Sequence, residues 1–219
     1  MNPISENYRR LLDRIGEASL RSGRSSEAVR LVGVTKRVAA ERVREAVECG
    51  LTDIGENWIQ EAEGKFPFLE DLDVTRHFIG HLQSNKARKA VGMFSWIQSI
   101  DSLGLAERIG RLATERIPVM IQVQVAPEDT KNGADPSEIG TIVETARANE
   151  GLDLRGLMTI PPFSSDPDAV RPFFARLRSL ADRWDLPDVS MGMSHDFEVA
   201  IEEGATIVRV GTALFGARQ

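Results

Sequence analysis

We expect this 219-residue chain to fold as a single α/β domain, a (β/α)8 barrel of the TIM type with an extra N-terminal helix. Three observations predict this fold. Short apolar runs alternate with helical patterns, and strict βα alternation predicts a parallel sheet covered by helices. Eight such runs follow the leading helix within roughly 190 residues, a length that suits a compact eight-stranded barrel. The first run is not followed by the G-x-G-x-x-G turn that a doubly wound, dinucleotide-binding sheet would show.

The leading helix covers residues 1–22, and Leu11, Leu12, Ile15 and Leu20 lie close to one of its faces. The expected strands then follow in order: Leu31–Thr35, Asp53–Gly55, His77–Gly80, Trp96–Ile100, Pro118–Val125, Leu154–Ile160, Pro187–Gly192 and Thr206–Gly211. No linker, low-complexity tract or repeat beyond the βα unit interrupts them. Residues 1–219 are therefore expected to form one domain.

Turn and cap residues mark where the intervening helices begin and end. Asp135-Pro136 and Asp166-Pro167 each place a proline directly after an N-cap residue, which predicts a helix start. Gly50, Gly151 and Gly204 stand where helices are expected to end.

Composition excludes several classes of function. The formal net charge of −6 lacks the basic footprint of a nucleic-acid-binding protein. The single cysteine, Cys49, excludes an internal disulfide framework and a cysteine-based zinc site. No apolar run approaches the length of a membrane span, and charged residues occupy the place of a signal peptide's apolar segment. We therefore expect a cytoplasmic protein that binds neither nucleic acid nor membrane.

Lys36 ends the first predicted strand, and active sites of (β/α)8 barrels are built at the carboxyl ends of their strands. Burial and neighbouring cations such as Arg37 can lower the pKa of a lysine there, so that its amine forms an imine. A solvated lysine at a strand edge is the alternative.

The last two βα junctions, residues 190–196 and 209–216, predict a phosphate site. Ser194 is a candidate N-cap of the helix after the seventh strand, whose free amides attract anions. Gly211 permits close backbone approach, and Thr212 supplies a hydroxyl and an amide. The loops after strands seven and eight are the recurrent phosphate site of this fold, although a helix cap and a closing turn would explain each motif singly.

Arg209 precedes the last loop and is expected to face the barrel mouth. Its guanidinium stays protonated, so it could donate to a ring nitrogen or a carboxylate, or form a plain salt bridge. A lysine amine, a phosphate cradle and an arginine donor fit a pyridoxal 5′-phosphate site. They fit a cofactor-free Schiff-base aldolase acting on a phosphorylated sugar almost as well.

Asn57 and His81 follow the second and third predicted strands and therefore fall at the same mouth. Asn57 could orient a phenolic oxygen, and His81 is a pocket residue that could act as an acid, base or donor. Capping of the local loops is the alternative for both. The histidines lack the spacing of metal ligands, so no metal is expected, and His77, inside a strand, is expected to be structural.

Six segments carry a resemblance to a known family. They are LVGVTK (31–36), GENWIQE (55–61), HFIGHLQSNK (77–86), GLMTIPP (156–162), SMGMSHDFEVAI (190–201) and RVGTALFG (209–216). Together they resemble the pyridoxal phosphate homeostasis proteins (the YggS/PROSC group), relatives of the N-terminal barrel domain of alanine racemase. The resemblance covers essentially the whole chain.

The resemblance implies that Lys36 holds pyridoxal 5′-phosphate as a Schiff base. It also implies that Met193, Ser194, Gly211 and Thr212 hold the phosphate. Arg209 would face the pyridine nitrogen, and Asn57 and Met158 would line the pocket. The sequence departs from the family pattern at His195, where a small or acidic residue is usual.

The resemblance further implies a non-catalytic protein of intracellular pyridoxal phosphate (vitamin B6) and amino-acid homeostasis, with no catalytic residue assigned. Alanine racemase uses a tyrosine from a second domain as a partner base, whereas Tyr8, the only tyrosine here, lies in the leading helix. A weak amino-acid racemase of the same fold type is the alternative. We expect a monomer whose partners are the cofactor and the apo forms of enzymes that use it.

Overall fold

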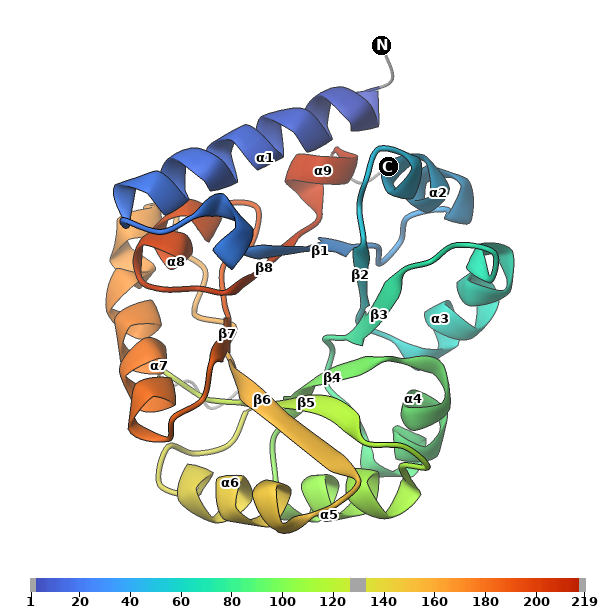
Figure 1. The fold of residues 1–219 in the computed structure, drawn as a ribbon, viewed down its shortest axis with the longest axis vertical. Coiled ribbons are helices and arrows are strands. Elements are labelled where there is room, and N and C mark those ends of the chain that lie inside the picture. The colour runs from blue at the N-terminus through green and yellow to red at the C-terminus, as the bar shows by residue number, and fades with distance from the viewer. Residues whose placement is uncertain (1–2, 127–132, 217–219) are drawn as a thin grey trace.

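A computed structural model describes residues 3–126 and 133–216. Eight parallel strands close into one barrel in the order β1-β2-β3-β4-β5-β6-β7-β8 and are ringed by helices (Figure 1). The strands are β1 (Arg30–Val34), β2 (Asp53–Glu56), β3 (Thr75–Phe78), β4 (Trp96–Ile100), β5 (Ile117–Gln122), β6 (Leu152–Met158), β7 (Asp188–Ser190) and β8 (Ile207–Val210). All eight predicted strands and the predicted barrel are therefore confirmed.

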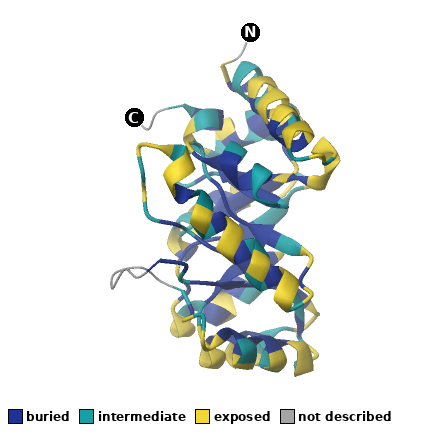
Figure 2. Cartoon of the chain, turned by 90° about the vertical axis from the view of Figure 1, so that its left-hand side faces the viewer, coloured by how far each residue is buried: buried dark blue, intermediate teal, exposed yellow. Residues whose placement is uncertain are grey.

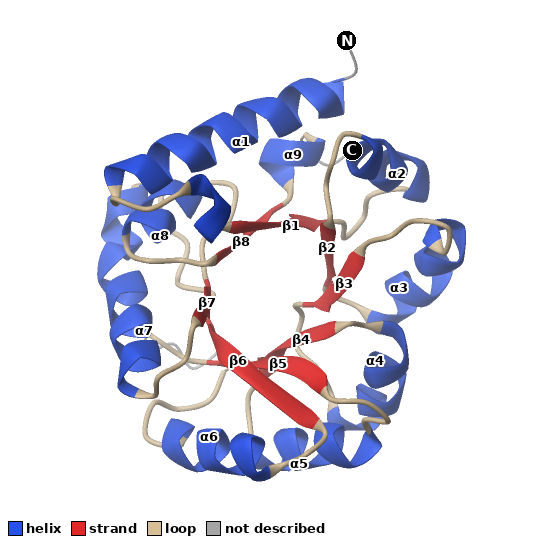
Figure 3. Ribbon diagram, viewed as in Figure 1, coloured by secondary structure: helices blue, strands red, loops and turns tan. Residues whose placement is uncertain are grey.

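A helix follows each strand on the outside of the ring (Figure 3). The helices are α1 (Pro3–Arg21), α2 (Ala40–Glu48), α3 (Ile59–Lys65), α4 (Ala87–Met93), α5 (Leu103–Leu112), α6 (Ile139–Ala148), α7 (Arg171–Arg183), α8 (Phe197–Glu202) and α9 (Thr212–Phe215). Short 3-10 turns precede or extend some of them, at Ser26–Ala28, Phe66–Leu69, Ser84–Lys86 and Pro167–Val170. Among the described residues, no helix is long and apolar enough to cross a bilayer.

The extra helix α1 packs across α8 and α9, which joins the start of the chain to its end (Figure 1). Leu11 and Ile15 are buried in this contact, as the periodicity predicts, together with Ile4. Leu12 and Leu20, which the prediction placed close to the same face, are 44% and 76% exposed, and Ala18 and Ser19 are buried instead. Met1 and Asn2, which the predicted helix included, lie outside the described residues.

Two of the predicted helix boundaries need correction. Asp135 does not cap a helix directly, because its carboxylate accepts hydrogen bonds from both the amide and the hydroxyl of Ser137 and closes a turn. Helix α6 begins only at Ile139. Gly151 is not a helix stop either: it packs so closely on Gly110 that a Cβ would collide with that residue's carbonyl.

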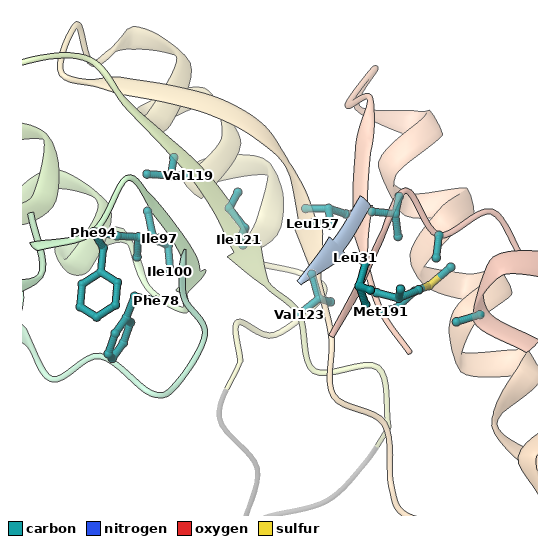
Figure 4. Close-up of a cluster of buried hydrophobic side chains, with 14 of the residues drawn as sticks. Leu31, Phe78, Phe94, Ile97, Ile100, Val119, Ile121, Val123, Leu157 and Met191 are labelled. Atoms are coloured by element: carbon teal, nitrogen blue, oxygen red, sulfur yellow. The ribbon is translucent and has the colours of Figure 1, made fainter. Parts of the chain in front are cut away.

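Successive strand residues alternate between two faces, both of which are covered, except where register shifts in the β4–β5 and β5–β6 pairs interrupt the pattern. Outward residues such as Ile97, Val119 and Leu157 form the main core between the sheet and the helices (Figure 4). Figure 2 shows the consequence, with buried strands inside and exposed residues on the outer faces of the helices. Inward residues form a small apolar cluster of Val32, Trp96, Met120, Met158 and Ile207. The remaining inward positions include the buried polar side chains Asp53, His77, Gln98, Ser190 and Arg209.

The sheet–helix core is expected to supply most of the stability. Ile109 of α5 is fully buried, whereas Leu103 in the same helix is 39% exposed. We expect Ile109→Ala to lower the free energy of unfolding by about 3 kcal/mol, through lost transfer energy and the cavity left behind. Leu103→Ala is the control and should cost less than about 1 kcal/mol. Urea unfolding followed by circular dichroism measures both, and equal losses would contradict this assignment of the core.

Candidate functional site

The carboxyl ends of all eight parallel strands meet at one end of the barrel, which we call the mouth. Lys36, Asn57 and His81 follow β1, β2 and β3, and Ser194 and Gly211 follow β7 and β8. Because β8 pairs with β1, the loop after β8 lies beside the end of β1. A Cβ on Gly211 would lie 3.4 Å from the carbonyl oxygen of Val34, two residues before Lys36. The first and last predicted motifs are thus neighbours at the mouth.

Ser194 forms a polar cradle with the loop after β8. Its Oγ accepts hydrogen bonds from the amides of Gly211 and Ala213, each at 3.2 Å. Thr212, between them, is exposed. Amides that converge on one oxygen are the donor set that a phosphate group uses, so this cradle fits a phosphate.

Ser194 does not cap α8, contrary to the prediction. The N-cap is Asp196, whose carboxylate accepts the amide of Met193 at 2.6 Å. Burial raises the pKa of Asp196, and the Met193 hydrogen bond and the positive charge of Arg209 oppose that rise. The Ser194 hydroxyl is therefore free of the helix and available to the cradle.

His195, the position at which the sequence departs from the family pattern, turns away from the cradle. Its Nε2 lies 3.1 Å from the carbonyl oxygen of Ser165, and its ring packs against Phe163. Both residues belong to the loop after β6. His195 therefore contacts the neighbouring loop and makes no hydrogen bond to the cradle.

Arg209 points into the barrel beneath the mouth and is 3% exposed. Its guanidinium donates to the Ser190 hydroxyl at 2.6 Å and to the carbonyl of Thr159 at 2.7 Å. Burial lowers the pKa of Arg209 to about 10, and the nearby Asp196 opposes that shift. The group is still a cation at neutral pH, and two of its five N–H donors are engaged by protein partners. Met158, fully buried beside Val32 and Met120, belongs to the apolar interior.

Lys36 sits in a tight turn that several contacts hold in place. Thr35 donates its amide to Gly55 and its hydroxyl to Glu56, at 2.9 and 2.7 Å. The Lys65 ammonium donates to the Thr35 carbonyl at 2.6 Å. Arg37, on the other side of Lys36, adopts a positive φ of 59°, a conformation that is uncommon for residues with a side chain. The backbone on both sides of Lys36 is therefore constrained.

The anchor of this turn is a buried ion cluster. Lys65 is 7% exposed and pairs with the fully buried Glu56 and, at 3.0 Å, with Glu61. Glu61 in turn accepts the amide of Arg37. Burial raises the pKa of Glu56, and the Lys65 ammonium opposes that rise. One ammonium thus holds together the two carboxylates that bind the Lys36 turn.

Asn57 and His81 lie together in a different part of the mouth. Both line a pocket of about 480 Å³ with Trp58, Gln60 and Lys86, which neither Lys36 nor Ser194 lines. His81 Nδ1 is 3.1 Å from the Asp101 carboxylate. Asn57 Oδ1 is buried without a partner among the described residues, and its backbone packs on Gly80 so closely that a Cβ there would collide with it. An orphaned amide oxygen is costly, so Asn57 fits a residue that pairs with a ligand.

Several polar residues near this site were not predicted. Gln98, Ser190 and Thr159 are fully buried, and their contacts come from strands far apart in the sequence. The available signal was a polar residue inside an apolar run, as Gln98 stands in WIQSI. No group of three or more His, Cys, Asp or Glu side chains in the described ranges could hold a metal ion.

The ion cluster around Lys65 gives a testable consequence. Lys65→Met would leave the buried Glu56 carboxylate and the partly buried Glu61 carboxylate without their cation, and we expect it to lower the free energy of unfolding by about 3 kcal/mol. Lys89→Met is the matched control, because Lys89 pairs with Glu63 at the surface and should cost no more than about 0.5 kcal/mol. Denaturant unfolding measures both variants. A Lys65→Met protein as stable as the control would show that the cluster does not hold the turn.

Comparisons with known proteins identify relatives along the whole chain. Residues 5–219 match the family described as alanine racemase, N-terminal domain. The pyridoxal phosphate homeostasis protein of Aquifex aeolicus is 44% identical over 223 residues, which cover 98% of each sequence.

Solved structures agree with this result. PipY of Synechococcus elongatus, in a structure with pyridoxal phosphate bound, is 40% identical with a TM-score of 0.83, covering 92% of this chain and 100% of PipY. An alanine racemase of Corynebacterium glutamicum is 18% identical with a TM-score of 0.71. The alignment covers 98% of this chain and 61% of the racemase, and at that identity it shows a common fold alone.

Proposed function

This chain belongs to the pyridoxal phosphate homeostasis proteins, within the alanine racemase N-terminal domain family, and from that premise we propose that it is a non-catalytic carrier of pyridoxal 5′-phosphate. The observation that carries the proposal is the position of the cradle. Ser194 and the Gly211 loop converge beside the end of β1, immediately before the turn that holds Lys36. Pyridoxal 5′-phosphate carries a phosphate and an aldehyde on one small ring, so one molecule can reach both the cradle and the Lys36 amine.

When bound, the cofactor supplies an aldehyde that condenses with a primary amine, here that of Lys36, with release of water. The amides of Gly211 and Ala213 and the hydroxyls of Ser194 and Thr212 bind the phosphate, with backbone near Met193 closing the cradle. The amides of Gly211 and Ala213 already converge on the Ser194 oxygen, so these two donors need little rearrangement to accept an anion.

Arg209 provides the contact to the ring nitrogen. A guanidinium keeps its protons at neutral pH, so it donates to that nitrogen and does not protonate it. The ring is consequently a weaker electron sink than one paired with a carboxylate. A weak electron sink suits a protein that holds the cofactor better than one that catalyses a reaction with it. Met158 contributes an apolar floor, and Asn57, which follows β2 beside β1, orients the phenolic oxygen through its side-chain NH2 group. His81 lies in the adjoining pocket.

A link between an amine and an aldehyde is reversible, so Lys36 would hold the cofactor without retaining it permanently. We propose that apo forms of pyridoxal-phosphate enzymes are the acceptors, and that the protein acts in the cytoplasm as a single-domain monomer. Such a carrier keeps a reactive aldehyde from reacting indiscriminately and sustains vitamin B6 and amino-acid homeostasis.

A weak amino-acid racemase is the competing function, because racemases share the fold. Two-base racemisation needs a second proton acceptor facing the first across the cofactor. Tyr8 cannot be that base: its hydroxyl donates to the Gly50 carbonyl at 2.9 Å, and it lines a pocket with Arg30 and Asp53. Those two residues begin β1 and β2, so Tyr8 lies at the opposite end of the barrel from the mouth.

Replacement of the lysine tests where the cofactor is held. We expect Lys36→Ala to lose the visible absorption band of the linked cofactor while its melting temperature stays within a few degrees of wild type, since Lys36 is half-buried at the mouth and outside the core. Lys89→Ala, a surface control, should keep the band. A Lys36→Ala protein with an unchanged band would contradict the assignment.

Proton exchange separates the carrier from the racemase. We expect the loaded protein, incubated with L-alanine in D₂O, to exchange the α-proton no faster than free pyridoxal phosphate at the same concentration. Proton NMR follows the Cα signal, and chiral chromatography of the same samples follows D-alanine. Exchange well above the free cofactor that disappears in Lys36→Ala would establish the racemase instead.

A further inference from the structure

A single chain of hydrogen bonds crosses the barrel interior beneath the mouth. Arg209 donates to the Ser190 hydroxyl at 2.6 Å, and that hydroxyl donates to Gln98 Oε1 at 2.6 Å. Gln98 Nε2 lies 2.9 Å from His77 Nδ1, and His77 Nε2 lies 2.8 Å from the Asp53 carboxylate. All five side chains are at least 90% buried, so the chain is shielded from solvent along its length.

Every donor in this chain points the same way. The amide nitrogen of Gln98 can only donate, so His77 Nδ1 accepts and carries no proton. His77 Nε2 then bears the proton and donates to Asp53. The order of donation therefore runs without a break from the guanidinium of Arg209 to the carboxylate of Asp53, and each bond polarises the next.

The charges at the two ends match this polarity. Burial lowers the pKa of His77, with Asp53 opposing, so the imidazole is neutral. Burial acts to raise the pKa of Asp53, but hydrogen bonds from His77 and Thr52 outweigh it and leave that pKa lowered. A cation, three neutral groups and an anion result, which is the arrangement that unidirectional donation requires.

The chain also joins opposite walls of the barrel. Ser190 belongs to β7 and Gln98 to β4, and two strands, β5 and β6, separate them in the closed sheet. Their contact must therefore pass through the interior, not along the sheet. With Ser190 on one nitrogen and the Thr159 carbonyl on another, the guanidinium plane of Arg209 is set, and its remaining donors are left for a ligand.

We propose that Ser190, Gln98 and His77 are positioning residues that aim the Arg209 guanidinium at the bound cofactor through this chain, with Asp53 as its fixed end. The inference rests on the proposed function, because it assigns Arg209 to the ring nitrogen. A buried side chain held on two sides loses no further conformational freedom when the ligand arrives, and this pre-organisation strengthens binding.

The test compares Ser190→Ala and Gln98→Met with Arg209→Ala. We expect each of the first two to raise the dissociation rate of pyridoxal phosphate roughly tenfold, and to shift its absorption maximum in the same direction as Arg209→Ala does. Ser99→Ala is the matched control: Ser99 lies on β4 beside Gln98 and is fully buried, but its hydroxyl has no partner among the described residues. That variant should leave both quantities unchanged.

A second measurement uses the cofactor-free protein and needs no variant. Nitrogen-15 NMR of histidine-labelled protein at neutral pH should show His77 as a neutral ring protonated at Nε2 and bare at Nδ1. A doubly protonated His77, or one protonated at Nδ1, would contradict the proposed direction of the hydrogen bonds, and this result does not depend on whether a variant folds.

The outcomes separate this inference from the proposed function. Wild-type protein that binds no pyridoxal phosphate would refute the function, whatever the state of His77. If the wild type binds but Ser190→Ala and Gln98→Met only lower the melting temperature, with the dissociation rate and absorption maximum unchanged, the chain merely stabilises the barrel. The function would then stand and the positioning role would be wrong.

Discussion

The pairing of β1 with β8 is the constraint on which the site depends. In an open sheet the first and last strands would be the two edges, and Lys36 would lie far from the Gly211 loop. Closure puts Val32 opposite Arg209 and brings the turn after β1 against the loop after β8. Helix α1 reinforces the same closure from outside, because Asn7 donates to the Leu214 carbonyl of α9 at 3.1 Å. The contact that completes the fold therefore also brings Lys36 beside the Ser194–Gly211 cradle, to which we assign the phosphate.

The two faces of the sheet differ in the side chains that they carry. The outward face carries the large apolar core against the helices and supplies the stability of the domain. This leaves the inward face able to hold charged groups such as Arg209 and Asp53, whose burial is costly unless they are paired. Glu56 is also buried, but on the outward face of β2, towards α3. Arg209 and Asp53 end one hydrogen-bond chain, and Glu56 is paired with Lys65 beneath the Lys36 turn. Both arrangements fix backbone or side chains at the mouth.

The sequence predicts the strands well and the polar contacts poorly, for a physical reason. Apolar runs and their alternation are local, so the eight strands and the position of Lys36 follow from spacing alone. The bond from Ser190 to Gln98 joins residues 92 positions apart, and no local pattern encodes it. Ser194 was expected to cap α8 because a serine before an apolar helix favours that role. Asp196 lies closer to the first turn and takes the cap, while the loop after β8 offers Ser194 two amides. His77 was expected to be a buried residue with satisfied hydrogen bonds, and it is fully buried with both ring nitrogens partnered.

The central claim is that one lysine at the mouth carries the cofactor in the wild-type protein. Reduction with borohydride after incubation with pyridoxal phosphate, followed by peptide mapping with mass spectrometry, tests it most directly. The account predicts one pyridoxyl group per chain, on the peptide that contains Lys36. Modification spread over surface lysines such as Lys89, with Lys36 unlabelled, would contradict it.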